Sequence, residues 1–225
     1  MPLLGQAAVA MWWDVATGQR AEFEHWHSHE HFPERLAIPG FLRGSRWASA
    51  DGGEGFFVMY ELERYETLTS SSYLARLNAP TPWSARMMPH HRNMVRSQCR
   101  VVASFGGGIA RGLATIRLTP AATESSFRQR LAGALGELPT LAGITGAHLL
   151  QTDTPQTSLT EEQRIRGGTD RVADWIVLVG GYDPDVVATI VTTHLGRDAL
   201  PAVSVGEECV IGFYTLAYAA TSRDF

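Results

Sequence analysis

Apolar residues recur in short runs along the chain, and the order of these runs predicts the fold. Residues 7–15, 41–50, 56–62 and 98–105 fit strands, because each is a compact or alternating apolar run of strand length. Asp51-Gly52-Gly53 is typical of a hairpin turn between the second and third strands. Residues 17–31 have a helical period, and residues 63–94 are helical in composition but broken by prolines. The first half therefore predicts the order βαββαβ.

The same order begins again after Gly106-Gly107-Gly108, which we interpret as a hinge. Strands are expected at 110–118, 146–152, 175–180 and 209–219, with helices from Thr119-Pro120 to about 138 and at 185–195. A period of roughly 105 residues suits a duplicated α+β unit rather than a solenoid. We therefore predict two repeats, residues 1–107 and 108–225.

Helices on one face of each βαββαβ sheet would leave the other apolar face bare. Two such sheets can bury their bare faces against each other. The predicted class is α+β, with two tandem ferredoxin-like βαββαβ repeats forming an α+β barrel.

The composition limits the classes of molecule that the protein is expected to bind. Hydrophobic content of 44% and charged content of 19% are those of an ordinary globular protein, and a formal net charge of −4 argues against nucleic acid or an anionic membrane. No run reaches 18 apolar residues, and no basic residue precedes the first apolar run. We expect a cytoplasmic protein.

Four of the eight histidines lie in residues 23–36. On a helical wheel His27 and Glu30 share the inward arc with Phe23 and Trp26, and His31 lies at the edge of that arc. His25 and His29 fall on the far side, where we expect solvated surface residues. Pro33 is expected to end the helix.

The second repeat supplies an internal comparison. A shift of 104 residues aligns His27 with Leu131, Glu30 with Ala134 and His31 with Leu135. The second copy is apolar where the first is ionisable, and ionisable groups on a buried face cost free energy unless they are paired or used. This contrast favours a functional cluster over a structural one, which remains the alternative.

A second cluster precedes the fourth strand, and it contains Trp83, Met87, Met88, His90, His91 and Met94. Met and Trp at this spacing are typical of core packing. Alternatively they wall an apolar pocket against the first helix, with His90 or His91 as a second polar group.

Residues 26–41 carry a family resemblance. Trp26, then Glu30-His31-Phe32-Pro33-Glu34-Arg35-Leu36 and Pro39-Gly40-Phe41, resemble the EthD-like branch of the dimeric α+β barrel superfamily; His27, Ser28 and His29 stand where that family more often has Tyr or acidic residues. The resemblance covers about residues 10–105. It implies kinship with small monooxygenases, lactone isomerases, polyketide cyclases and haem enzymes, several of which use a pocket between the helices and the sheet.

These observations lead us to expect a small-molecule enzyme acting on an apolar or aromatic metabolite in catabolism or secondary metabolism. His31 would shuttle a proton, Glu30 would fix its tautomer, and His27 or His91 would assist. Isomerase, cyclase or lyase chemistry needs no more than this, so we expect no cofactor and no metal, although His27, His31 and Glu30 could reach one ion. Exposed helix faces favour a homodimer.

Two alternatives stay open. One is a non-catalytic ligand-binding or accessory protein with the same pocket. The other is a haem- or metal-dependent oxidoreductase, with His90 or His91 as the proximal haem ligand, by analogy with the haem enzymes of the superfamily.

The stretch 152–174 is polar and much longer than its counterpart in the first repeat. Ser158-Leu159-Thr160-Glu161 resembles a capping box and predicts a short helix there. Such a loop is either a lid or dispensable surface, and its polar backbone leads us to expect that shortening it leaves the fold intact.

Overall fold

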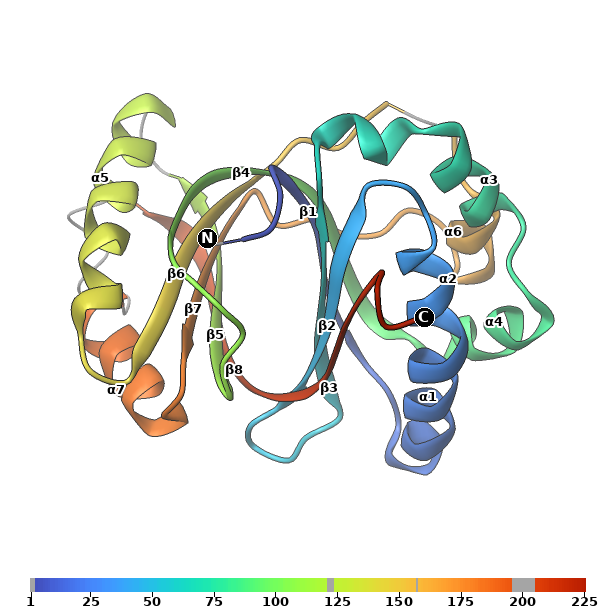
Figure 1. Ribbon diagram of the computed structural model, residues 1–225, viewed down its shortest axis with the longest axis horizontal. Coiled ribbons are helices and arrows are strands. Elements are labelled where there is room, and N and C mark those ends of the chain that lie inside the picture. The colour runs from blue at the N-terminus through green and yellow to red at the C-terminus, as the bar shows by residue number, and fades with distance from the viewer. Residues whose placement is uncertain (1–2, 121–123, 157, 196–204) are drawn as a thin grey trace.

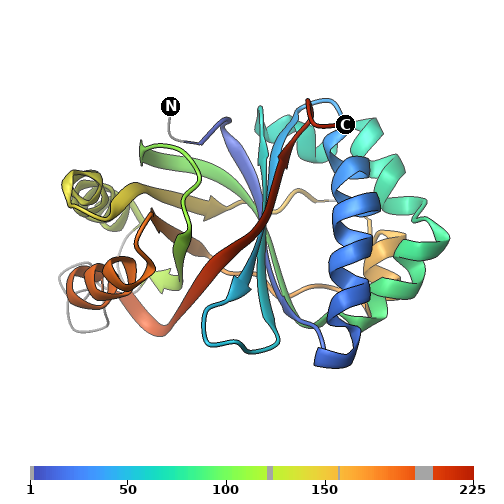
Figure 2. The ribbon, with the colours of Figure 1, turned by 60° about the horizontal axis from the view of Figure 1, so that its bottom comes forward.

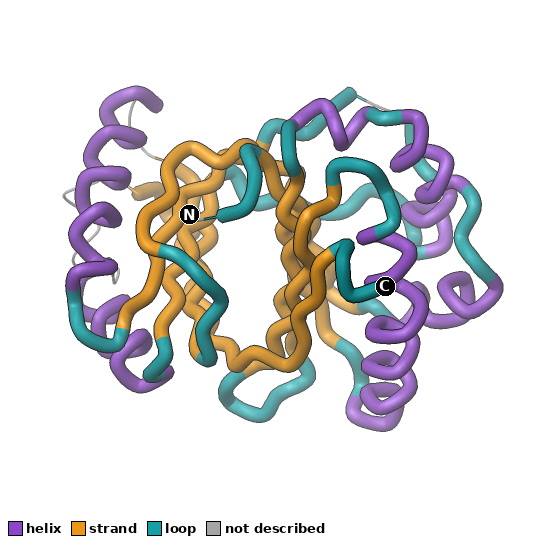
Figure 3. Tube along the Cα trace, viewed as in Figure 1, coloured by secondary structure: helices purple, strands orange, loops and turns teal. Residues whose placement is uncertain are grey.

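Eight antiparallel strands close into a barrel with helices packed on its outside. The computed structural model describes residues 3–120, 124–156, 158–195 and 205–225. Around the barrel the strands follow the order β1-β3-β2-β8-β5-β7-β6-β4, and the last strand pairs with the first. The closed wall is seen end-on in Figure 3. The predicted α+β class and barrel are confirmed.

The first half of the barrel comes from the N-terminal part of the chain (Figure 1). Its strands are β1 (Ala7–Asp14), β2 (Phe41–Ser49), β3 (Gly55–Leu62) and β4 (Arg92–Gly106). Its helices are α1 (Arg20–Trp26), α2 (Phe32–Leu36), α3 (Ser71–Asn78) and α4 (Pro82–Met87), with single 3₁₀ turns at Thr17–Gln19, Tyr65–Thr69 and Met88–His90.

The second half repeats the order with one extra helix. Its elements are β5 (Gly112–Pro120), α5 (Glu124–Glu137), β6 (Ile144–Thr152), α6 (Glu161–Ile165), β7 (Trp175–Gly181), α7 (Pro184–Leu195) and β8 (Val205–Thr221), with a 3₁₀ turn at Leu138–Thr140. Among the described residues, no helix is at once long and apolar enough to cross a membrane.

The two halves are joined by exchanged strand pairs. Strand β2 of the first half pairs with β8 of the second, and β6 of the second pairs with β4 of the first. Inside the barrel the apolar faces of both sheets meet, and the Trp12 indole N–H donates to Thr115 Oγ1 across the halves at 3.1 Å. Helices α1 to α4 and α6 cover one outer side, and α5 and α7 cover the other (Figures 1 and 2).

The predicted boundaries beside β4 and β5 are wrong. Strand β4 begins at Arg92 rather than residue 98, because polar residues at its start still pair with β1. Thr119-Pro120 does not open a helix, because β5 continues through Pro120, which pairs with Val205 of β8, and the Thr119 hydroxyl donates to Asp174. Helix α5 is described from Glu124, and residues 121–123 lie outside the described part.

Pro33 does not end the first helix. Between α1 and α2 the chain makes one π-helical turn over His27–His31, in which the Phe32 N–H donates to the His27 carbonyl five residues back. In a regular α-helix the Pro33 ring would clash with the carbonyl four residues before it. The wider turn relieves that clash, and Pro33 lies in the first turn of α2 without ending the helix.

A glycine lets this helix lie close to the sheet. A Cβ at Gly44 of β2 would overlap the ring of Phe32, which is fully buried. We expect Gly44→Ala to lower the free energy of unfolding by about 1–3 kcal/mol, the usual cost of overpacking. The matched control is Gly133→Ala on α5, where a Cβ meets nothing within 4 Å and the change should be neutral or stabilising. Urea unfolding measures both, and equal effects would contradict the explanation.

Candidate functional site

A small cavity lies between the first helix and the outer face of the first half-sheet. Its volume is about 30 Å³, which is room for a single water molecule. Polar groups and aromatic rings converge on it from strands and helices of the first half, from α6, and from the segments before β4 and after α6. The lining residues that bear on the argument below are His27, His31, Arg35, Tyr60, Tyr73, Met88, His91, Arg96, Glu162 and Arg166.

His27 and His31 face this cavity from the π-helical turn. His27 is 1% exposed and His31 is 9% exposed, and their ring centroids are 5.3 Å apart. The His27 ring packs against the edge of Phe32, and its Nδ1 lies 3.4 Å from a guanidinium nitrogen of Arg46. The π-turn rotates the residues that follow it, which brings His31 fully inward from the edge of the predicted arc.

His91 joins them from the segment before β4. Its ring stacks on Trp13 with centroids 4.8 Å apart and lies 5.8 Å from the Trp26 ring. The residue as a whole is half-buried, yet both of its ring nitrogens are shielded from solvent. Within the described residues, neither nitrogen of His91 and not the Nδ1 of His31 has a hydrogen-bond partner. Such unpartnered buried nitrogens are uncommon and invite a functional explanation.

All three imidazoles are neutral at pH 7. Burial, followed by the charge of Arg46, holds the pKa of His27 well below its usual value, and burial with Arg35 does the same for the pKa of His31. Burial and the charge of Arg166 lower the pKa of His91 to about 3. Each ring can therefore accept a proton only if something in the cavity stabilises the charged form.

A buried ion pair closes the cavity from the other half of the chain. Arg35 of α2 donates to the Glu162 carboxylate of α6, and both side chains are almost completely buried. Arg166 lies 3.8 Å from the second oxygen of Glu162 and is itself paired with Asp170 at 2.8 Å. Burial works to lower the pKa of Arg35, but the charge and hydrogen bond of Glu162, together with Tyr73 and Tyr60, outweigh it and the pKa is raised.

Part of the stretch 152–174 is packed against the first half, while many of its described residues are exposed. A short helix is present as predicted, but Thr160 is its N-cap and forms a capping box with Gln163, so the box begins two residues later than Ser158. The Glu161 N–H donates to the Asn78 side chain at the end of α3. Figure 1 shows α6 against α2 and α3, far from the other helices of its own half. We name residues 160–166 the α6 cover.

Glu30 lies outside the cavity. Its carboxylate accepts from the Trp26 indole N–H at 3.0 Å and from the hydroxyls of Ser84 and Thr81 on the neighbouring α4 segment. No hydrogen bond joins it to His31 among the described residues, so the expected fixing of the His31 tautomer has no contact to act through. The same π-turn that rotates His31 inward turns Glu30 toward α4, where it ties the two helices together.

Only part of the second predicted cluster, the one that precedes the fourth strand, lines the cavity. Met88 and His91 line the cavity, as does Met94. Met87 is 2% exposed and packs into the core, Trp83 lies against the His25 ring, and His90 is half-buried away from the cavity lining. Trp26 does not line it either, but its ring lies 4.6 Å from that of His31 and backs it.

The second repeat shows what replaces the imidazoles. Leu131 and Leu135, the counterparts of His27 and His31, are fully buried in an apolar core with Phe127. Ala134, the counterpart of Glu30, is exposed, so the expectation that all three positions face inward is wrong for this one. The helix of the first half therefore carries two buried imidazoles where apolar packing alone suffices in the second.

The residues around the cavity do not fit a metal ion or a haem. Imidazole ligands normally donate their second ring N–H to an acceptor that orients them. Among the described residues the His91 nitrogens have no such acceptor, and the Nδ1 of His31 has only the Glu34 carboxylate at 4.0 Å, beyond hydrogen-bond distance. Arg35, Arg46 and Arg166 also place positive charge beside the rings, which disfavours a bound cation. The same charges favour a ligand that is, or becomes, an anion.

Several residues of the site were missed by the sequence analysis, and the most important are Arg35, Glu162 and Arg166. Arg35 falls outside the inward arc of a regular helix and enters the cavity only because of the π-turn. A proline inside an otherwise periodic helix is the signal that could have revealed it. Glu162 and Arg166 come from a polar loop of the other half, and no local pattern connects them to the histidines.

Comparison with known proteins identifies the fold. No family model matches the chain, and no curated protein matches it. Solved structures match over nearly the whole length: an anthrone oxidase-like protein at TM-score 0.66 and 11% identity covers 96% of this chain and 93% of its own. A protein of Fusobacterium nucleatum provisionally assigned as a monooxygenase has TM-score 0.62 and 7% identity, with coverage of 97% and 96%.

A protein provisionally assigned as a chlorite dismutase has TM-score 0.55 and 14% identity, and the alignment covers 96% of both chains. All three matches span both halves of the barrel. At these identities the likeness concerns the fold and not the chemistry. The chain has the α+β barrel fold of tandem ferredoxin-like proteins, and its structural neighbours include monooxygenase-like proteins.

Proposed function

We propose that the protein is an oxidoreductase that acts on an aromatic small molecule, with the neutral imidazoles of the cavity as the bases that start the reaction. The observation that carries the proposal is that three neutral imidazoles meet at a cavity lined by aromatic rings. Among the described residues, the Nδ1 of His31 and both ring nitrogens of His91 have no hydrogen-bond partner there. A neutral imidazole is the side chain best suited to take a proton near pH 7.

The proposed first step is proton transfer from an acidic C–H or O–H of the substrate to His31 or His91. A methylene that lies between two aromatic rings and is conjugated through them with a ketone is acidic enough for such a base. Removal of its proton leaves an electron-rich enolate, which dioxygen can oxidise. In the balanced reaction one oxygen atom replaces the two methylene hydrogens as a ketone, and the other oxygen leaves with those hydrogens as water.

The arginines around the cavity suit this step. The enolate is an anion, and Arg35 and Arg166, which line the cavity, are positioned to stabilise it as its charge develops, while Arg46 adds positive charge from its place beside His27. The same charges that lower the imidazole pKa values would be offset by the substrate anion, which lets an imidazole hold the transferred proton. An empty cavity thus has weak bases, and an occupied one has effective bases.

Substrate entry requires the α6 cover to move. A small-molecule pocket commonly has on the order of 300 Å³ or more, whereas the closed cavity has about 30 Å³. The cover is fastened by polar contacts: the Arg35 pair and the hydrogen bond from Glu161 to Asn78. A substrate anion can replace the Glu162 carboxylate on Arg35, which couples binding to opening.

Two likenesses support the proposal. Structural neighbours are described as an anthrone oxidase-like protein and as monooxygenases, and an anthrone is a substrate with the methylene described above. The motif in residues 26–41 supports placing the chain in the EthD-like branch, and with it a role in catabolism or secondary metabolism.

The test uses an anthrone as probe, with dioxygen uptake and ketone formation measured together. We expect His27→Leu, His31→Leu, which adopts the residues of the second repeat, to lower turnover by about 10²–10⁴-fold, the usual contribution of a positioned base. Above pH 7 its free energy of unfolding should stay within about 1 kcal/mol of the parent, since neutral rings give way to apolar side chains of similar size. The control is His29→Leu, because His29 is exposed.

Other results of this assay would favour one of the alternative functions. Conversion without dioxygen uptake would replace the oxidoreductase by an isomerase, cyclase or lyase that uses the same proton transfer. Saturable binding without conversion would indicate a binding or accessory protein. Full activity in the double variant would remove the imidazoles from the mechanism.

A further inference from the structure

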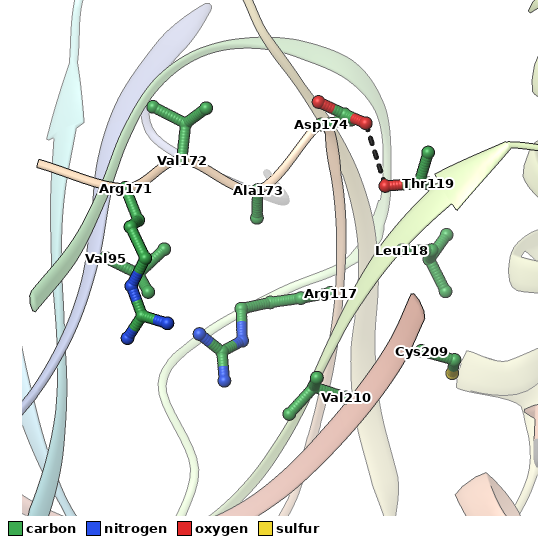
Figure 4. Close-up of a pocket in the computed structure, with 10 residues that line it drawn as sticks. All are labelled: Val95, Arg117, Leu118, Thr119, Arg171, Val172, Ala173, Asp174, Cys209 and Val210. Atoms are coloured by element: carbon green, nitrogen blue, oxygen red, sulfur yellow. Dashed lines mark hydrogen bonds between the residues drawn. The ribbon is translucent and has the colours of Figure 1, made fainter. Parts of the chain in front are cut away.

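A second and larger cavity opens at one end of the barrel interior. Its volume is about 470 Å³, well within the range of small-molecule pockets. It is lined by residues from β4, β5 and β8 and by the segment before β7. Figure 4 shows this lining, which consists of Val95, Arg117, Leu118, Thr119, Arg171, Val172, Ala173, Asp174, Cys209 and Val210.

Two arginines direct their guanidinium groups into this cavity. Along β5, Leu113 belongs to the barrel interior and Thr115 bonds the interior Trp12, so the alternation of the strand places Arg117 inside as well. Arg171 enters from the segment before β7, where its carbonyl accepts from the Arg96 N–H and fixes the segment against β4. In Figure 4 the two guanidinium groups lie side by side in the open space.

Neither group is neutralised. Among the described residues no carboxylate forms a salt bridge with Arg117 or Arg171, although surface arginines such as Arg92 and Arg100 have such partners. Arg171 donates to the Asn93 carbonyl, and Arg117 lies over the Trp12 ring at 5.1 Å. Burial, together with the neighbouring Arg171, lowers the pKa of Arg117.

Two carboxylates lie near the cavity, Asp174 in its lining and Asp14 beside Arg117, but neither forms an ion pair with the two arginines among the described residues. Asp174 at the rim accepts from the Thr119 hydroxyl at 2.8 Å, and Asp14 accepts from the Asn93 amide at 2.7 Å. The two like charges repel each other unless an anion joins them, and the charge of Arg117 is also partly desolvated, whereas Arg171 lies on an exposed segment. The rest of the wall is largely apolar, with Val95, Leu118, Val172 and Val210.

We propose that this barrel-end cavity binds a small organic anion, whose carboxylate or phosphate group is held by Arg117 and Arg171 and whose apolar body lies against the valines. Guanidinium groups bind such oxyanions through pairs of parallel hydrogen bonds. The histidine cavity is on the outer face of the sheet and this one is inside the barrel. The proposal therefore stands independently of the proposed function.

The test is calorimetric titration of the full chain at low ionic strength with phenyl phosphate, benzoate and inorganic phosphate. We expect saturable binding of phenyl phosphate or benzoate at one site per chain, tighter than that of inorganic phosphate because of the apolar wall. The better of the two organic probes identifies phosphate or carboxylate as the natural group. Arg117→Met and Arg171→Met should each weaken binding at least tenfold.

Two controls locate the site. Arg223→Met removes one charge from an exposed terminal position, and His31→Leu alters the other cavity, so both should bind the probe as the parent does. Arg117→Met should melt no lower than the parent, since it relieves repulsion between like charges. If it fails to fold, Arg171→Met, on an exposed segment, gives the same test.

Three results would overturn the proposal. They are the absence of saturable binding of all three probes to the parent, unchanged affinity in the Met variants, and loss of binding in His31→Leu. A further variant, Arg117→Lys, keeps the charge but loses the forked geometry, and it should bind more weakly than the parent and more tightly than Arg117→Met.

Discussion

Glu162→Ala is expected to lower the free energy of unfolding by about 3–5 kcal/mol, the usual result of removing one member of a buried ion pair. The change leaves the Arg35 guanidinium buried without its carboxylate, and one nitrogen of that guanidinium already has no partner among the described residues. Arg166 retains Asp170, so the cost falls mainly on Arg35. Urea unfolding at pH 7.5 measures the effect.

The neighbouring residue of the same helix provides the control. Glu161 pairs with Arg164 at 3.0 Å, and both side chains are about half exposed. Glu161→Ala should cost at most about 1 kcal/mol, because exposed pairs contribute little. The double change Arg35→Met, Glu162→Leu should be less destabilising than Glu162→Ala, since an apolar pair strands no buried charge. A cost for Glu162→Ala no larger than that for Glu161→Ala would contradict the proposed fastening of the α6 cover.

The fold could be predicted from the sequence because its main features are local and repeated. Each strand is a short apolar run, each hairpin or hinge is marked by glycine, and the two halves repeat the order βαββαβ with one buried phenylalanine, Phe23 or Phe127, at the same register. The ends of the strands were predicted less accurately. Polar residues at the start of β4 belong to the strand because their backbone pairs with β1, although their side chains are not part of an apolar run.

The candidate site was predictable only where helical periodicity holds. His27 lies inward on the wheel and in the structure, since it precedes most of the π-turn. Beyond the start of that turn the wheel no longer applies, so the inward placement of Glu30 is wrong, and the position of Arg35 in the cavity could not be predicted from the wheel. The cause is Pro33. It was interpreted as the end of the helix, whereas the helix continues past it through a wider π-helical turn over the preceding residues.

The contacts from the second half could not be predicted by any local rule. Glu162 reaches Arg35 across 127 residues of sequence, and α6 has too few apolar residues to suggest a packed position. What buries it is a complementary charge on α2 rather than a hydrophobic face. The unusual length of this polar loop and its capping pattern indicated a short helix, but they did not indicate which residues that helix contacts.

The buried imidazoles should make the protein sensitive to acid. His27, His31, His91 and His148 all have a pKa below the ordinary 6.5, mainly because of burial, and the pKa of His148 is lowered to about 4. Each is neutral in the folded chain and takes up a proton in the unfolded chain below pH 6.5. The unfolded state then binds more protons, so the free energy of unfolding falls as the pH falls.

We expect this loss to begin near pH 6.5 and to reach about 1.4 kcal/mol for each imidazole at pH 5.5, or about 6 kcal/mol for the four. The stabilising contribution is fully present above pH 6.5, and it keeps declining until the folded pKa is reached, about 3 for His91. The raised pKa of half-buried Glu34 acts in the opposite direction and offsets a small part. Urea unfolding at pH 8, 6.5 and 5.5 measures the trend.

Two double variants distinguish the contribution of His27 and His31 to this pH dependence from that of other titrating groups. His27→Leu, His31→Leu removes two of the four imidazoles and should halve the decline between pH 8 and 5.5. His25→Leu, His29→Leu removes two exposed histidines of the same helix and should leave the decline unchanged. An equal decline in the parent and in the first variant would show that His27 and His31 are hydrated in solution, which would mean that the α6 cover is open in the resting protein.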